Sequence, residues 1–267
     1  DGRQVVSGAD DHTLRVWDLV SGESVRTLSG HTGTVRAVAV TPDSSRVVSG
    51  SADNTVRVWD LASGKLVRNF SGHTGSVRAV AVTPDGRQVV SGADDHTVRV
   101  WELDSGESLR IFRGHTDWVR AVAVTPDGRQ VVSGADDKRL RVWDLVGGET
   151  MRTLRGHTDL VRAVAVTLDG RQVVSGADDT TLRVWDLASG ESVYTLSGHT
   201  DAVQTVAVTP DGRQVVSGAD DHKLRVWGLA AGSEKACIVL DAAVYSVAVG
   251  PDGSTLVAGD ASGNVWC

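Results

Sequence analysis

Five histidines stand at a fixed interval along the chain, and each follows a glycine. They are His31, His73, His115, His157 and His199. Imidazole is a common metal ligand and a general base near neutral pH, so these residues first suggest a metal or proton-transfer site. Each repeat supplies one such histidine, however, with no second ligand at metal-binding spacing. His12, His96 and His222 follow a turn aspartate in the same repetitive way, and we expect them to be solvated. The pattern predicts no metal site.

Adjacent aspartates form a second candidate set, because paired carboxylates suggest an acid–base dyad or a Ca²⁺ site. The pairs are Asp10-Asp11, Asp94-Asp95, Asp136-Asp137, Asp178-Asp179 and Asp220-Asp221. Neighbouring residues rarely aim both carboxylates at one point, and the six or more oxygen ligands that Ca²⁺ takes are absent nearby. A glycine-rich phosphate loop, Gly-x-Ser-x-Gly and His-Glu-x-x-His are also missing from the sequence. We expect no catalytic residue, no cofactor and no enzymatic activity.

Composition narrows the classes of partner. The 267 residues carry a formal net charge of −7, whereas nucleic-acid binding draws on positive charge or a clear basic patch. No apolar run approaches the roughly 18 residues of a membrane span. Cys237 and Cys267 lack the spacing of a zinc or redox motif, which fits a reduced setting. We expect a cytoplasmic protein that binds neither nucleic acid nor membrane.

The elements that position these residues follow from a strict repeat. Six tryptophans recur every 42 residues: Trp17, Trp59, Trp101, Trp143, Trp185 and Trp227. Each repeat reads as short alternating apolar runs (VRAVAV, QVVSG, TLRVWDL and VRTL) broken by turn residues, which predicts four strands. Turns such as Pro84-Asp85-Gly86 preset a tight hairpin, and Leu168 in place of proline predicts a less rigid turn in the fifth repeat. A four-stranded sheet cannot bury both faces alone, so neighbouring sheets must stack, as in a β-propeller.

The Gly-His pairs, the Trp-Asp pairs and the period resemble the WD40-repeat family over essentially the whole chain. The resemblance implies an all-β, seven-bladed propeller of four-stranded antiparallel blades. Residues 1–267 then form one domain, whose repeats end near the six tryptophans and whose degenerate last repeat covers 240–267. Glu102 and Gly228 replace the aspartate after tryptophan, so we expect that aspartate to be dispensable.

The first and last blades are expected to be incomplete. The first repeat begins inside a turn and lacks its innermost strand, and the last lacks its outer strand. The sequence therefore predicts 26 strands where seven closed blades need about 28, with about 20 completing residues upstream. Trp266 falls on the arginine position of the LRVWD motif, with Ala258 on the serine position, so it is not a seventh motif tryptophan. The missing initiator methionine suggests a fragment or processed piece.

The resemblance also assigns the histidines a structural role. In the WD40 family such a histidine bonds an aspartate, a serine or threonine, and the tryptophan of its own blade. Such a network satisfies buried polar groups together. Carried onto this chain, the tetrads are His31, Ser49, Asp53 and Trp59; His73, Ser91, Asp95 and Trp101; His115, Ser133, Asp137 and Trp143; His157, Ser175, Asp179 and Trp185; and His199, Ser217, Asp221 and Trp227.

One position inside the repeat varies freely, three residues after each Gly-His histidine. It holds Thr34, Ser76, Trp118, Leu160 and Ala202, and the resemblance places it on the top face, where family members bind partners. We expect the arginine two places later to lie beside the first aspartate of the pair, either in a solvated salt-bridge network or as a recognition surface. Trp118 is either a binding hot spot or a plug over neighbouring loops. The candidate residues are Trp118, Leu160, Arg120, Arg162, Arg78, Arg36, Asp94 and Asp136.

The leading interpretation is a non-catalytic interaction scaffold or sensor that binds a protein or peptide on its top face. Near-identical repeats resemble bacterial WD40 proteins, and the degenerate end resembles C-terminal sensor propellers of bacterial signalling proteins of the STAND type. The alternative is a purely structural repeat scaffold, designed or excised, with no ligand of its own.

Overall fold

Strands account for all the regular structure of residues 2–267, which a computed structural model describes. No helix occurs among these residues, and so none that could cross a membrane. The chain divides into two compact units, one with residues up to 133 together with 143–151, the other with residues 134–142 and 152–267. We call them the first and second unit; the fourth of seven sheets contributes strands to both.

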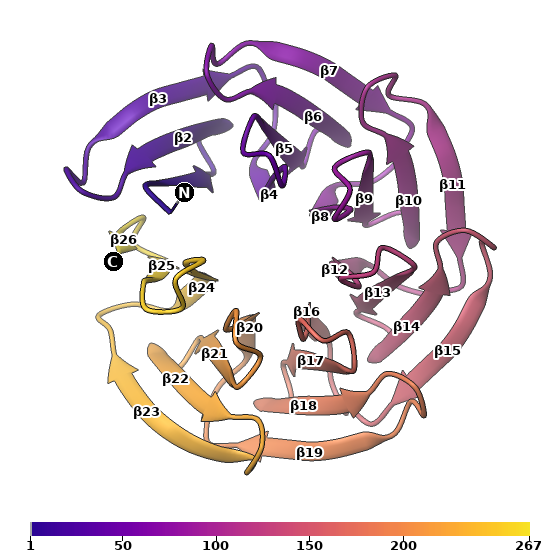
Figure 1. Ribbon diagram of the computed structural model, residues 1–267, viewed down its shortest axis with the longest axis vertical. Helices are drawn as coiled ribbons and strands as arrows, with labels where there is room; N and C mark the ends of the chain where they lie inside the picture. Colours follow the sequence, from indigo (N-terminus) through magenta and orange to yellow (C-terminus); the bar gives the residue numbers. More distant parts are fainter. Residues whose placement is uncertain (1) are drawn as a thin grey trace. The chain divides into compact units, whose positions relative to one another are not determined.

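The first three sheets lie in the first unit (Figure 1). Their strands are β1 Gln4–Gly8, β2 Thr13–Asp18 and β3 Ser24–Ser29; β4 Val35–Val40, β5 Arg46–Ser51, β6 Thr55–Asp60 and β7 Leu66–Ser71; and β8 Val77–Val82, β9 Gln88–Ala93, β10 Thr97–Glu102 and β11 Ser108–Arg113. The fourth sheet contains β12 Val119–Val124, β13 Gln130–Ala135, β14 Arg139–Asp144 and β15 Thr150–Arg155.

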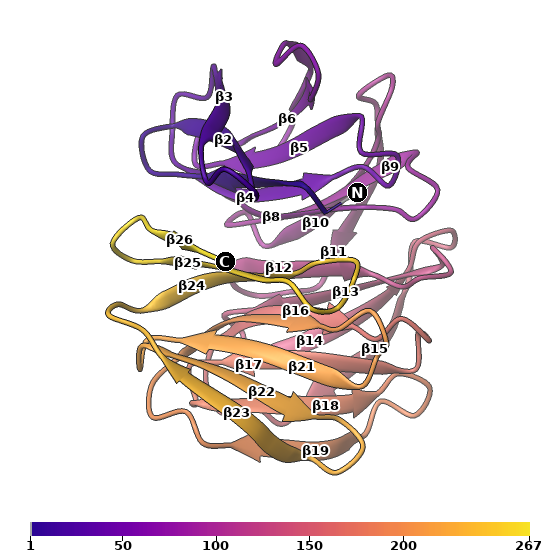
Figure 2. The same ribbon diagram turned by 60° about the vertical axis from the view of Figure 1, so that its left-hand side comes forward.

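The last three sheets lie in the second unit. Their strands are β16 Val161–Val166, β17 Gln172–Ala177, β18 Thr181–Asp186 and β19 Ser192–Ser197; β20 Val203–Val208, β21 Gln214–Ala219, β22 Lys223–Gly228 and β23 Ser233–Val239; and β24 Val244–Val249, β25 Leu256–Asp260 and β26 Val265–Trp266. Figure 2 shows β25 between β24 and the short β26.

Each sheet pairs its strands in chain order, so neighbours are antiparallel and joined by short turns. Sheets one and seven have three strands and the others four, which gives 26 strands. The prediction of an all-β, seven-bladed propeller with incomplete first and last blades is confirmed. Ala258 pairs with Trp266, as Ser217 pairs with Arg225 in sheet six, so the expected register of the last repeat is also confirmed.

Apolar residues of adjacent sheets form the core within each unit. In the first unit, Val56 and Phe70 of sheet two pack with Val77 and Trp101 of sheet three, all essentially buried. Within each unit, the first strands of neighbouring four-stranded sheets lie side by side, as with β4 and β8 or β16 and β20. Gly50 fits this approach because a Cβ there would come within 2.6 Å of Val77 Cγ1. The small residue in the VVSG motif is therefore a packing requirement.

A β-bulge interrupts the first strand of sheets two, three, five, six and seven. In sheet two, Val35 pairs with Ser51 and Ala37 with Gly50, which leaves Arg36 as the extra residue. Bulges re-aim a side chain at the end of a strand. The same irregularity falls at Arg78, Arg162, Gln204 and Tyr245. In sheets two to seven, we call the end that holds the loop before the first strand and the turn joining the second and third strands the top end; the bulges lie there.

The turn at Leu168 has the same backbone hydrogen bond as its proline-containing counterparts. Gly170 N donates to Thr167 O over 2.8 Å, and Gly86 N donates to Thr83 O over the same distance. Leu168 therefore adopts the turn without proline's fixed φ, and its lower rigidity stays a prediction.

Candidate partner-binding rim and the polar networks beneath it

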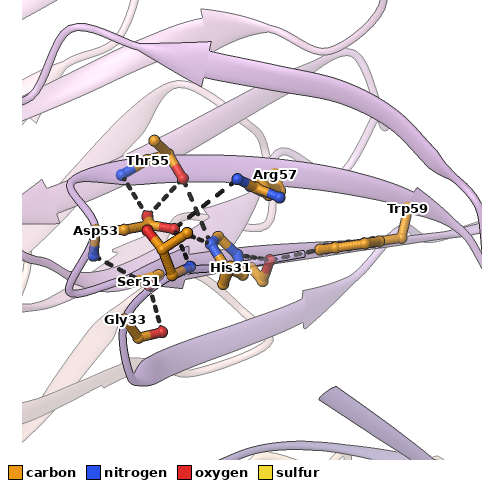
Figure 3. A network of polar contacts seen from close by, with 9 residues as sticks. His31, Gly33, Ser51, Asp53, Thr55, Arg57 and Trp59 are labelled. Carbon is orange, nitrogen blue, oxygen red and sulfur yellow. Dashed lines mark hydrogen bonds and ion pairs between the residues drawn. The ribbon is translucent and has the colours of Figure 1, made fainter. Parts of the chain in front are cut away.

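A buried hydrogen-bond chain lies under the top end of sheet two (Figure 3). Trp59 Nε1 donates to Ser49 Oγ over 2.8 Å, and that hydroxyl lies 2.7 Å from His31 Nε2. On the other side of the ring, His31 Nδ1 lies 2.8 Å from Asp53 Oδ2. Ser49 is fully buried and Trp59 nearly so, so these polar groups must satisfy one another.

The chain of donors fixes the tautomer of His31. Indole Nε1 can only donate, so the Ser49 hydroxyl accepts from it and gives its own hydrogen to His31 Nε2. Nδ1 then carries the ring hydrogen and donates it to Asp53. Burial lowers the pKa of His31, outweighing the opposing influence of Asp53, so the ring is neutral at pH 7. This histidine is a structural relay rather than a free base or ligand.

Asp53 ties the loop before β4 to the turn after β5. Its carboxylate accepts hydrogen bonds from the Thr32 amide and from the Thr55 amide and hydroxyl. Burial opposes ionisation, but these bonds and the one from His31 hold the pKa of Asp53 well below its usual range. Asn54, between Asp53 and Thr55, takes a left-handed conformation with φ of 66°, which asparagine tolerates. The network therefore fixes the backbone from which the variable position projects.

The predicted tetrads are brought together in four sheets. Those of sheets three, five and six repeat the His–Asp, His–Ser and Trp–Ser contacts of sheet two. In sheet four, Ser133 Oγ lies within hydrogen-bond distance of His115 Nε2 and accepts from Trp143 Nε1, while Asp137 accepts from the Arg139 amide.

The two incomplete sheets depart from this scheme. In sheet one, Trp17 Nε1 donates to Ser7 Oγ over 2.8 Å in a repeat that has no Gly-His pair. In sheet seven, Trp266 Nε1 donates instead to Asp260 Oδ2 over 2.7 Å, a contact the sequence did not suggest.

Arginine–aspartate pairs line the top end at the bulge positions. Arg78 donates through Nε and Nη2 to the two carboxylate oxygens of Asp94, the Nη2 bond measuring 2.9 Å. Arg162 forms the same fork with Asp178, at 2.7 and 2.6 Å. The Arg78 and Asp94 side chains are only 15% and 16% exposed. The expectation of a solvated salt-bridge network is therefore wrong for these pairs, because the bulge lays each arginine along the turn that carries its acid.

Two sheets break this pairing. In sheet six, Gln204 Nε2 donates to Asp220 Oδ2 over 2.7 Å, and the buried Asp220 Oδ1 has no hydrogen-bond partner. In sheet two the aspartate position holds Ala52, beside the exposed Arg36. Both substitutions can be seen in the sequence. Only the register of the bulges shows that they leave Asp220 without an arginine and Arg36 without an aspartate.

Trp118 is held at the top end of the first unit. The residue is 39% exposed, and its amide donates to Asp117 Oδ1 over 2.8 Å. The guanidinium carbons of Arg78 and Arg120 lie 4.6 and 4.9 Å from the ring centroid, within the range of cation–π attraction. Trp118 thus covers a neighbouring arginine and still offers surface to solvent, so both interpretations of this residue retain support.

Two other predicted rim residues, Leu160 and Asp136, are less exposed. Leu160 is half-buried in the second unit, with its amide bonded to Asp159 Oδ1, and Asp136 is buried. Tyr245, at the bulge of sheet seven, is 57% exposed and was missed as a candidate. Its alignment with the arginines of other repeats was the available signal.

Residues 2–267 contain no group of three or more His, Cys, Asp or Glu that could hold a metal ion. His12, His96 and His222 are exposed in left-handed turn positions, with φ of 68°, 64° and 63°.

Comparisons with known proteins agree with this architecture. The family model described as "WD domain, G-beta repeat" matches residues 1–18, 22–60, 64–102, 106–144, 148–186, 190–228 and 235–267. A stretch of 34 residues is 59% identical to F-box/WD repeat-containing protein 7 of Drosophila melanogaster, covering 13% of this chain and 3% of that protein. Another of 42 residues is 43% identical to nuclear distribution protein PAC1 of Mycosarcoma maydis, covering 16% and 9%. The aligned stretches thus span less than a tenth of either relative.

Proposed function

Since the chain belongs to the WD40 family of G-beta repeat proteins, we propose that it is a non-catalytic scaffold that binds a protein or peptide on its top end, with Trp118 as the main contact. WD40 propellers are typically interaction scaffolds of this kind. We include Arg36, Arg78, Arg120 and Asp94 of the first unit as surrounding contacts, whereas Asp136 lies in the second unit. Asp136, Leu160 and Arg162 of the second unit are proposed as contacts in their own right.

The observation that carries this proposal is the exposed, clamped indole of Trp118. The fold does not require an aromatic there, because equivalent positions hold threonine, serine, leucine and alanine. Two arginines already restrict its motion, so a partner meets a preorganised apolar surface. Tryptophan and arginine are enriched in binding hot spots, where truncation costs about 2 kcal/mol or more.

Pull-down with identification by mass spectrometry tests the proposal. Trp118→Ser installs the residue that sheet three carries, Ser76, and should leave the backbone intact. Leu109→Ser is the matched control, since Leu109 is 41% exposed on the outer strand β11. A partner retained by wild type and Leu109→Ser but lost by Trp118→Ser supports the proposal. Identical partner sets for all three proteins contradict it and favour a purely structural scaffold.

We also propose a parent protein of bacterial signalling type, with these repeats as its sensor. Two features of the sequence support this proposal: the near-identity of AVAVTPDGRQVVSGADD between repeats, and the degenerate last repeat. The two relatives above come from a fly and a fungus, so the proposal rests on the sequence features alone. The coding sequence around this segment tests it: a nucleotide-binding switch module there is expected, and its absence contradicts the assignment. Exposed free thiols at Cys237 and Cys267 support a cytoplasmic setting.

A further inference from the structure

Arg36 is a cation whose intrablade acid has been replaced. It occupies the bulge of β4, as Arg78 occupies the bulge of β8. Arg78 forks onto Asp94, whereas the corresponding position in sheet two is Ala52. The Arg36 side chain is exposed, and no hydrogen bond or ion pair engages it among the described residues.

The backbone around the two arginines is the same. Ala52 N donates to Thr34 O over 2.9 Å, and Asp94 N donates to Ser76 O over 2.9 Å. The Cβ of Ala52 therefore stands where the Cβ of Asp94 stands in the next sheet, with no carboxylate beyond it. Sheet three thus shows in this same chain how a carboxylate is received by an arginine at this bulge.

We propose that Arg36 binds a carboxylate of the partner in the place that the Asp94 carboxylate fills in sheet three. The planar guanidinium offers two parallel N–H donors, which match a carboxylate better than a single ammonium does. The carboxylate is either an acidic side chain or the free C-terminus of a peptide. This inference rests on the proposed function, because it names the chemistry of the partner docked beside Trp118.

The arrangement of the first unit gives such a partner a second contact. Strand β4, which carries Arg36, lies beside β8, which carries Arg78. Arg78 in turn stacks against Trp118. A peptide crossing this part of the top end would meet an unpaired cation, then a neutralised ion pair, then an exposed indole. It would satisfy them with an acidic group and, a short distance along, an apolar side chain.

The net negative charge of the chain opposes the binding of acidic peptides. With a formal net charge of −7, long-range attraction favours basic peptides over acidic ones. A preference for acidic peptides would therefore have to arise from the local chemistry at Arg36.

Selection from a phage-displayed library of random heptapeptides tests the proposal on the full chain. Wild type should enrich sequences that combine an acidic residue, or an acidic free terminus, with an aromatic or aliphatic residue. Ala52→Asp supplies Arg36 with the internal acid that sheet three has, so this variant should lose the acidic preference while keeping its fold. Trp118→Ser should lose the apolar preference.

Calorimetric titration of one enriched peptide, synthesised with and without C-terminal amidation, measures the effect. Arg36→Gln and Ala52→Asp should each weaken binding by about tenfold or more, the range of a charge-assisted hydrogen bond. Lys65→Gln, which removes an exposed positive charge at the opposite end of sheet two, should change affinity less than twofold in comparison. Loss of binding on amidation assigns the carboxylate to the terminus, and retained binding assigns it to a side chain.

The outcomes separate this inference from the proposed function. Enriched peptides could require Trp118 but be neutral or basic, and bind Arg36→Gln as tightly as wild type. This result would overturn the carboxylate site at Arg36 and leave the proposed function standing. Peptides that bind Trp118→Ser as tightly as wild type contradict Trp118 as the main contact. A library that yields no enriched peptide counts against both.

Discussion

Replacing Ser49 by alanine removes the central hydroxyl of the network in sheet two. Two buried groups then lose their partner at once: the Trp59 indole N–H and His31 Nε2. Each unsatisfied buried polar group costs about 1–3 kcal/mol, so we expect Ser49→Ala to lower the free energy of unfolding by about 2–6 kcal/mol. The backbone itself accepts alanine, because Ala258 occupies this position in sheet seven.

Urea denaturation followed by tryptophan fluorescence measures this loss, with Ser7→Ala as the matched control. Ser7 receives the same bond from Trp17, but its repeat has no histidine partner and is less buried, so its loss should be about 1 kcal/mol. The difference between the two variants isolates the contribution of the histidine. Equal losses for the two, or a loss below about 1 kcal/mol for Ser49→Ala, would refute the relay of hydrogen bonds derived for His31.

Three further outcomes follow from single positions and can be measured by thermal or urea unfolding. Gln204→Arg should stabilise the protein by up to about 1 kcal/mol, because the fork seen in sheets three and five would reach the unpartnered Asp220 Oδ1; unchanged stability would contradict this geometry. Leu168→Pro should stabilise by about 0.4–1 kcal/mol by restricting the unfolded chain, and destabilisation would show that the turn is not compatible with proline. Burial lowers the folded-state pKa of His31 and His199, so the unfolded state binds protons first and stability should fall as pH drops below about 6.5; a protein equally stable at pH 7.5 and 5.5 would refute neutral, buried rings.

Sheet number, strand order and the identity of the relay residues could be predicted from the sequence because the repeat samples them several times. A period that places serine, aspartate and tryptophan at constant offsets from histidine leaves little freedom in their pairing. The pairing of the degenerate last repeat was also predictable, because its register places Trp266 at the arginine position of the LRVWD motif. Its bond to Asp260 was not, because no other repeat contains that combination.

The rim was harder to predict because it depends on bulges, which a repeat pattern does not reveal. Strict alternation would not direct Arg78 along the turn toward Asp94, and without that geometry the pair looks like ordinary solvated surface charge. The same limit applies to Tyr245, whose exposure follows from its bulge position. Side-chain contacts between repeats, such as Arg78 with Trp118, are equally invisible to a pattern read one repeat at a time.

Because the repeats are nearly identical, each substitution in one repeat can be compared with the same position in the others. Ala52 removes an acid and leaves Arg36, whereas Gln204 removes a cation and leaves Asp220, so the two units carry opposite unmatched groups on otherwise equivalent bulges. The Asp220 oxygen is buried, so it bears on stability, whereas Arg36 is exposed and bears on recognition. A partner of the first unit must distinguish sheets whose framework is the same, and Ala52 beside Arg36 together with the indole of Trp118 gives it a chemical basis for doing so.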